Sequence, residues 1–166
     1  VVVTGTAGDD TIVQTSTGFV ADGTVITVSG GVETATIDGQ GGDDAFVATG
    51  TPAVPVQVNG VRDMAIMGTP GSDVIAFLPS CHAEEIIGVL NCAIVADFSP
   101  TGRLIAHGGN GDDDIAVAGG IGLSSWLYGD GGNDRLKGGD GPNVIVGGAG
   151  DDLLVGGSGR DVMIGG

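Results

Sequence analysis

Residues 129–164 read GDGGNDRLK, GGDGPNVIV, GGAGDDLLV and GGSGRDVMI, which are four consecutive segments of nine residues. Each segment opens with a glycine-rich turn, carries Asp or Asn at its sixth position and has an apolar residue at its eighth. Successive side chains of an extended chain point to opposite faces, so the eighth residue faces inward while its neighbours face solvent. Each segment therefore predicts a turn followed by a short strand, with the inward residues Leu136, Ile145, Leu154 and Met163.

A single segment cannot bury its own apolar face, but a stack of segments can. We predict that two segments form one coil. Strands of successive coils then pair in parallel, and their inward residues form two facing ladders. The predicted class is an all-β solenoid, either a parallel β-roll or a β-helix.

The segments GGAGDDLLV and GGSGRDVMI resemble the calcium-binding nonapeptide of the repeats-in-toxin (RTX), or hemolysin-type, family. Two earlier segments extend the resemblance to residues 108–166: GGNGDDDIA from Gly108 and the degenerate GGIGLSSWL from Gly119. The resemblance implies a right-handed parallel β-roll that binds several Ca²⁺ ions. It also implies a secreted, extracellular bacterial protein exported by a type I secretion apparatus.

The acidic residues favour calcium independently of the repeat. The chain has 21 Asp and Glu against 5 Lys and Arg, a formal net charge of −16, and Glu occurs only at Glu33, Glu84 and Glu85. Tight turns that present carboxylates to a hard cation favour the short Asp side chain. So few basic residues leave no patch for phosphates, which argues against nucleic acid and anionic membrane surfaces as partners. No apolar run is long enough for a membrane span.

The resemblance implies that sixth-position Asp residues of turns on the same side bind an ion together. It pairs Asp113 with Asp134, and Asp134 with Asp152. Glycine-rich turns offer carbonyl oxygens to the coils on either side, and the donor set lacks the soft ligands that zinc and copper prefer. The backbone ligands that we expect belong to Gly109, Gly111, Gly129, Gly131, Gly132, Gly147 and Ala149.

The other side of the predicted roll departs from the family pattern. Its sixth-position residues are Ser124, Asn143 and Asp161. A neutral Ser or Asn brings at most a weak oxygen ligand and no charge. We therefore expect calcium to be weak or absent between Ser124 and Asn143, and marginal between Asn143 and Asp161.

Upstream, the same turn recurs without tandem spacing, in GTAGDDTIV from Gly5, GQGGDDAFV from Gly39 and GTPGSDVIA from Gly68. We interpret residues 1–107 as irregular β-helix-like coils, continuous with the roll at 108–166. Segments such as TVITVSG, ETATIDG and VPVQVNG would supply extra strands, and the coils shorten toward the C-terminus. The three upstream turns fit metal sites or ordinary Gly-Asp turns equally well. If they bind metal, one flank carries a column made of Asp10, Asp44, Asp73, Asp113, Asp134 and Asp152.

Two features leave alternatives open. Cys81 and Cys92 are compatible with a small disulfide loop or with two buried hydrophobic side chains. The stretch from Leu78 to Pro100 fits the repeat poorly and is compatible with a short helical excursion or with another strand.

Two histidines and two aromatic residues invite comparison with metal-binding or carbohydrate-binding residues, but we assign none of them a function. His82 and His107 lack partners at metal-ligand spacing, so we interpret both as surface residues. Trp126 occupies the inward eighth position of its segment and is interpreted as a core residue. Tyr128 is exposed and is a weak candidate for carbohydrate contact.

The predicted function is a calcium-triggered fold. Two carboxylates about 5 Å apart repel by roughly 3 kcal/mol at an effective dielectric of 20, so the metal-free segment should be largely disordered. The scattered basic residues argue against catalysis by this chain. Alternatives are a calcium-rigidified adhesin or surface spacer, and an accessory module of a β-helical polysaccharide lyase or epimerase. The start at Val1 lacks a signal sequence, so we expect the remainder of a larger parent chain to carry the export signal.

Overall fold

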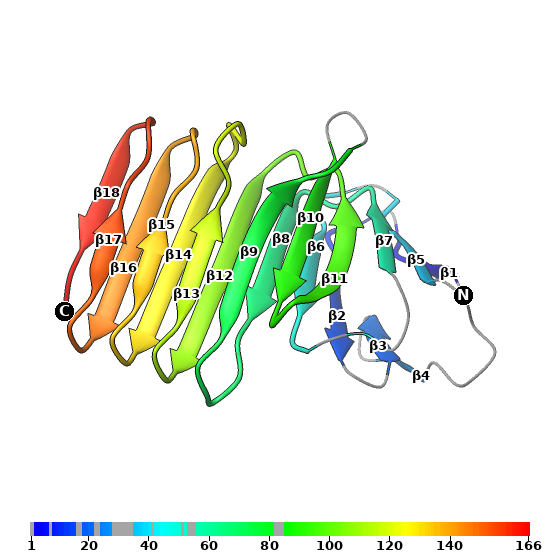
Figure 1. Ribbon diagram of the computed structural model, residues 1–166. Coiled ribbons are helices and arrows are strands. Elements are labelled where there is room, and N and C mark those ends of the chain that lie inside the picture. Colours follow the sequence, from blue (N-terminus) through cyan, green and yellow to red (C-terminus); the bar gives the residue numbers. More distant parts are fainter. Residues whose placement is uncertain are drawn as a thin grey trace.

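The computed structural model describes residues 2–6, 8–15, 18–21, 24–27, 35–40, 42–50, 52, 56–81 and 85–166. These residues form eighteen strands in two nine-stranded sheets and no helix (Figure 1). The all-β prediction is therefore confirmed for this part of the chain. Since the described residues form strands and turns alone, they include no helix that could cross a membrane.

The two sheets extend along the length of the molecule, one on each side of the core. In spatial order, the first sheet contains β1 (Val2–Thr4), β5 (Ala35–Asp38), β7 (Val56–Asn59), β11 (Ala93–Phe98), β10 (Ile86–Leu90), β9 (Val74–Pro79), β13 (Asp114–Val117), β15 (Arg135–Lys137) and β17 (Leu153–Val155). The second contains β18 (Asp161–Ile164), β16 (Asn143–Ala149), β14 (Ser124–Gly131), β12 (Arg103–Asn110), β8 (Asp63–Met67), β6 (Ala45–Ala48), β2 (Thr11–Thr15), β3 (Gly18–Ala21) and β4 (Thr24–Thr27).

From β12 onward the chain alternates between the sheets, so one coil contains one strand of each. Neighbouring strands of successive coils pair in parallel, for example β14 with β16 and β15 with β17. The hydrogen bond between Asp134 and Asp152 spans 18 residues, which is two nonapeptides. The corresponding bond spans 21 residues from Asp113 and 40 residues from Asp73. The two-segment coil is therefore confirmed from β12 onward. The coils shorten from Asp73 to Asp152, but the predicted shortening along the whole chain is wrong, because upstream β6 and β8 pair Ala45 with Asp63, an offset of 18 residues.

The sheets are mixed, which corrects the prediction of a wholly parallel solenoid. Strands β2, β3 and β4 form an antiparallel meander in the second sheet. Strands β9, β10 and β11 form another in the first sheet. The described residues between Leu78 and Pro100 therefore contain two extra strands, β10 and β11, and no helix. They return the chain along the edge of β9 before the next coil begins.

The two cysteines lie at opposite ends of β10, the middle strand of this second meander. Cys81 precedes β10 and Cys92 follows it, with a positive φ of 66° in the turn to β11. Both are exposed and they are not joined by a disulfide, so neither the disulfide nor the buried-hydrophobe interpretation holds.

The core lies between the sheets. Ile115 and Leu136 from the first sheet and Leu127 and Ile145 from the second are completely buried. Of the other predicted inward residues, Leu154 is partly buried against the core, whereas Met163 is 52% exposed. Met163 belongs to β18, an edge strand that pairs with β16 alone.

The predicted core position of Trp126 is wrong by one residue. The segment from Gly119 is one residue longer than a nonapeptide, and Leu127, not Trp126, is in register with Ile145. Trp126 therefore faces outward and is half-buried, with the guanidinium of Arg103 4.5 Å from its ring centroid. The same shift makes Ser125, and not Ser124, the sixth-position residue of its turn, because Ser125 pairs with Asn143.

Candidate metal centre

The turns that carry the sixth-position residues lie on two flanks of the stack. The lower flank, at the lower edge in Figure 1, comprises the turns at residues 68–73, 108–113, 129–134 and 147–152, which lead from the second sheet to the first. The upper flank comprises the turns that lead from the first sheet to the second, including those at residues 5–10, 39–44, 138–143 and 156–161.

The predicted single column of six Asp residues is therefore wrong. Asp10 and Asp44 lie on the upper flank, where the backbone N–H of Asp10 donates to Oδ1 of Asp44 at 2.9 Å. Three strands, β6, β7 and β8, separate the turn at 39–44 from the turn at 68–73. Because each strand crosses from one flank to the other, an odd number of strands moves the next turn to the opposite flank.

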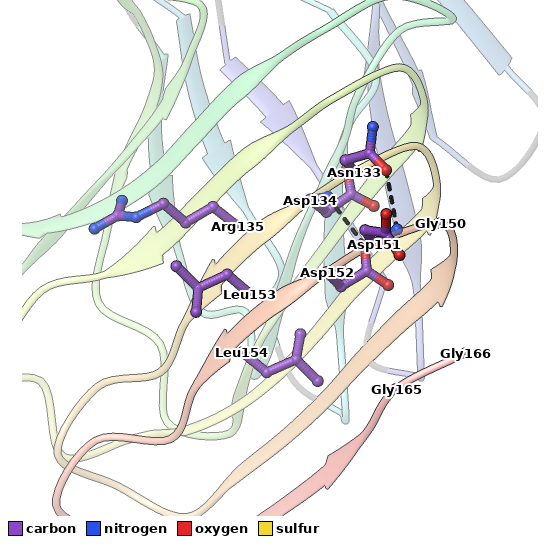
Figure 2. Close-up of a pocket in the computed structure, with 10 residues that line it drawn as sticks. All are labelled: Asn133, Asp134, Arg135, Gly150, Asp151, Asp152, Leu153, Leu154, Gly165 and Gly166. Carbon is purple, nitrogen blue, oxygen red and sulfur yellow. Dashed lines mark hydrogen bonds between the residues drawn. The ribbon is translucent and has the colours of Figure 1, made fainter.

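On the lower flank, four carboxylates form a ladder with one member per coil. The backbone N–H of each Asp donates to Oδ1 of the Asp on the next coil, at distances of 2.7, 2.8 and 2.9 Å along the series. Figure 2 shows the last step, in which the side chains of Asp134 and Asp152 lie one above the other. The members of the ladder are Asp73, Asp113, Asp134 and Asp152.

The second oxygen of three of these carboxylates has no donor. Oδ2 of Asp113, Asp134 and Asp152 is buried without a hydrogen-bond partner among the described residues, and the first two residues are only 3% and 2% exposed. A buried polar group without a partner costs about 1–3 kcal/mol, and more when it is charged. Three such oxygens on one flank therefore oppose the folded state by an amount comparable with the stability of a whole domain.

The unpartnered oxygens of Asp113 and Asp134 each lie close to a carbonyl oxygen of the next coil. A methyl group built on Gly129 would lie 2.2 Å from Oδ2 of Asp134 and 2.4 Å from the carbonyl oxygen of Gly147. One built on Gly108 would lie 2.1 Å from Oδ2 of Asp113 and 2.8 Å from the carbonyl oxygen of Gly129. A carboxylate oxygen and a carbonyl oxygen thus lie around the same space beside the first glycine of the turn. A side chain at this glycine would fill that space.

The remaining turn residues bring the coils into close backbone contact. The N–H of Gly111 donates to the carbonyl of Gly131 at 2.8 Å, and the N–H of Gly132 to the carbonyl of Ala149 at 2.9 Å. Gly132 has a φ of 142°, and a methyl group on it would lie 1.9 Å from the carbonyl oxygen of Gly111. Because a carbonyl oxygen has two lone pairs, Gly131 and Ala149 can still offer an oxygen to a cation.

Burial and mutual repulsion also raise the pKa values of two carboxylates on the lower flank. Burial, and then the charges of Asp134, Asp73 and Asp112, raise the pKa of Asp113 to about 6, against the lowering effect of the N–H of Asp73. Burial, followed by the charges of Asp152, Asp112 and Asp130, also raises the pKa of Asp134. Without a cation, these carboxylates hold protons more tightly than an ordinary Asp does.

Two predicted ligands, Asp10 and Asp73, are already provided with donors. Oδ2 of Asp73 accepts from the backbone N–H of Thr69 at 2.6 Å and from its hydroxyl at 3.0 Å. Thr6 donates to Asp10 in the same way, at 2.6 and 3.1 Å. A Thr at the second position of the turn thus satisfies these carboxylates. Asp44 has no such Thr, and its buried Oδ2 has no partner in the described part of the chain.

At other positions of the upper flank, buried or partly buried polar side chains hydrogen-bond to one another. Asn143, only 1% exposed, lies between Ser125 and Asp161 and hydrogen-bonds to both. Nearer the N-terminus, Nη2 of Arg103 lies 2.6 Å from Oδ2 of Asp63. Burial raises the pKa of Asp63, but its hydrogen bonds to Arg103 and the charge of that residue hold the pKa below its usual value.

No group of three or more His, Cys, Asp or Glu side chains able to hold a metal occurs among the described residues. The carboxylates of the lower flank meet in successive pairs, so a cation there would also need the turn carbonyls. Nδ1 of His107 lies 3.1 Å from Oδ2 of Asp130, and its ring stacks on Tyr128 at 4.4 Å between centroids. His82 lies outside the described residues.

Comparison with known families assigns the C-terminal part of the chain. Residues 128–166 match the family model of the RTX calcium-binding nonapeptide repeat, in four copies. The match begins later than the resemblance at residue 108, so the first two segments of the predicted roll lie outside it. No curated protein and no solved structure matches the chain.

Proposed function

We propose that this chain, whose residues 128–166 carry four RTX calcium-binding nonapeptide repeats, is a segment of a secreted bacterial protein that folds when it binds calcium. The repeat is a structural calcium-binding module, and the proposed role is therefore structural and not catalytic. The observation that carries the proposal is the row of buried Oδ2 atoms without donors at Asp113, Asp134 and Asp152.

The oxygens of the lower flank fit Ca²⁺, which prefers carboxylate and carbonyl ligands. Asp113 and Asp134 would hold one ion between their coils, and Asp134 and Asp152 another. When bound, the ion supplies the positive charge that the buried carboxylates lack. The carbonyls that would complete the two sites belong to Gly109, Gly111, Gly129, Gly131, Gly132, Gly147 and Ala149.

The upstream carboxylates and Asp161 differ in how strongly they support calcium. Asp44 has an unpartnered Oδ2, so the pair of Asp10 and Asp44 is the better upstream candidate. Asp73 would contribute less, because Thr69 already donates to it. Asp161 faces the neutral Asn143, so we propose at most marginal binding there.

Calcium binding would drive the folding of the segment. In the unfolded chain the carboxylates are separated and hydrated, whereas in the metal-free folded chain they are buried next to one another. The binding energy of the ion therefore becomes folding energy. Extracellular calcium modules bind at about 10⁻⁴ to 10⁻³ M, a concentration found outside cells and not in the cytosol. Such a segment would stay unfolded before export, by a type I apparatus, and fold afterwards.

We further propose that residues 108–166 form a right-handed parallel β-roll, continuous with the irregular coils of residues 1–107. The parallel pairing of β12 to β18 supports the roll. The antiparallel meanders lie upstream of residue 100 and support the division.

The proposal is tested by counting bound calcium in two matched variants. Asp134→Ala removes the carboxylate that both lower-flank pairs share, so this variant should bind two ions fewer than the original chain by calorimetry. Asp151→Ala removes the same charge from an exposed position beside Asp152 and should leave the number unchanged. Equal ion numbers in the two variants would contradict the assignment.

A further inference from the structure

The side chain of Asn143 is enclosed by oxygens on the upper flank. Its Nδ2 lies 2.8 Å from the carbonyl oxygen of Gly141, 2.8 Å from that of Gly156 and 3.3 Å from that of Gly139. Oδ1 of Asp161 lies 2.7 Å from the same nitrogen. The amide oxygen accepts from the hydroxyl of Ser125 at 2.6 Å. Both ends of a nearly completely buried amide are therefore satisfied.

These four oxygens have counterparts on the lower flank at the same repeat positions. Gly139 and Gly141 are the second and fourth residues of their segment, and Gly156 and Asp161 are the first and sixth of the next segment on that flank. The residues at these positions beside Asp113 are Gly109, Gly111, Gly129 and Asp134. That set is the one from which the proposed function takes its calcium ligands.

We infer that the amide nitrogen of Asn143 takes the place of a calcium ion, and that Asn143 thereby decides which flank of the stack depends on metal. The inference rests on the proposed function for the lower flank. On the upper flank, the two amide hydrogens of Asn143 are shared among the four oxygens that a cation would otherwise bind.

The chemistry of the amide explains why the upper flank needs no calcium at Asn143 and why calcium binds poorly there. Asn143 carries no charge, so its contact with Asp161 has one carboxylate, whereas each lower-flank pair has two. An ion entering between them would displace the amide hydrogens from oxygens at 2.7–2.8 Å and leave a buried donor without a partner. Calcium therefore binds at most marginally at this position, and the contact of β16 with β18 forms without it.

The lower flank should respond in the opposite sense. An Asn in place of Asp134 would point amide hydrogens at the carbonyl oxygen of Gly147 and at Asp152, as Asn143 does at Gly156 and Asp161. Such a chain would bind fewer ions and would also need less calcium to fold. An ordinary loss of a ligand would have the opposite effect on folding.

The test exchanges the two residue types and measures bound calcium by calorimetry and folding by circular dichroism. Asn143→Asp should bind one further ion, and the calcium concentration at half-folding should rise several-fold. Asn133→Asp adds the same charge at an exposed position on the lower flank and should bind no further ion. If the original chain binds calcium but Asn143→Asp binds no further ion, the inference is overturned while the proposed function stands. If the original chain binds none, both fail.

A second pair of variants decides the matter if Asn143→Asp does not fold. Asp134→Asn and Asp134→Ala should both lose the two lower-flank ions. Asp134→Asn should fold at a lower calcium concentration than the original chain, and Asp134→Ala at a higher one. Equal calcium requirements in the two variants would show that the amide does not replace the ion.

Discussion

The metal-free protein should become less stable as the pH rises from 5 to 7.5, which is unusual for an acidic chain with ordinary carboxylates. Burial and neighbouring charges raise the pKa of Asp113 to about 6 in the folded state, from an ordinary value of 3.8. A carboxylate with a raised folded-state pKa stabilises the fold below its unfolded value, and this contribution disappears as the pH rises through the folded value.

The magnitude follows from these two values. The full difference corresponds to about 3 kcal/mol, of which about 1.4 kcal/mol is lost between pH 5 and pH 7.5. Asp134, whose pKa is also raised, adds a loss of the same sign. We therefore expect the metal-free chain to lose at least about 1.4 kcal/mol of unfolding free energy over this interval.

The assay is the folded fraction of the chelator-treated chain by circular dichroism at both pH values, from which the unfolding free energy follows, repeated in saturating calcium. Calcium should reverse the trend, because the ion binds the ionised carboxylates and protons compete with it. Asp113→Asn should reduce the pH dependence without calcium, whereas Asp151→Asn, at an exposed position, should not. A chelated chain that is equally stable or more stable at pH 7.5 would contradict the raised pKa values of Asp113 and Asp134.

Two further substitutions test the geometry of the site and of the core. Gly129→Ala places a methyl group 2.2 Å from Oδ2 of Asp134 and should weaken calcium binding about tenfold or more, by an overpacking cost of about 1–3 kcal/mol. Gly122→Ala meets no atom within 4 Å and is the matched control in the same calorimetric titration. Leu127→Ala should lower the unfolding free energy from urea denaturation in calcium by about 2–5 kcal/mol, because this side chain is completely buried. Trp126→Ala should cost less in the same denaturation assay, and the opposite order would contradict the observed register.

The sequence predicted the C-terminal coils well because the repeat there is regular. A strict nine-residue period specifies which residue faces inward, as Leu136 and Ile145 show. It also specifies which Asp residues stack, as the contact of Asp134 with Asp152 shows. The inserted residue before Trp126 broke the period, and the sequence offered no signal for whether the insertion lies in the turn or the strand.

The upstream half was harder to predict, because the side on which a turn falls depends on how many strands precede it. Asp10 and Asp44 belong to the same kind of turn as Asp73, yet lie on the other flank. Counting strands would have revealed this, but the short strands β6, β7 and β8 are separated by irregular segments that no repeat marks. The meander after β9 was hidden for the same reason.

The role of Asn143 shows what a residue type alone leaves out. The sequence predicted that a neutral side chain weakens calcium binding on its flank. That the amide nitrogen meets four oxygens follows from the packing of one turn against the next. The partnered carboxylates of Asp10 and Asp73 had a visible signal, namely the Thr at the second position of each turn.

We expect calcium to drive the folding of this chain. The most direct measurement is far-ultraviolet circular dichroism of the chelator-treated protein during titration with calcium, with magnesium as the control for charge screening. We expect a cooperative gain of β signal with calcium and none with magnesium. A chain that is fully folded in the chelator and indifferent to calcium would contradict the account.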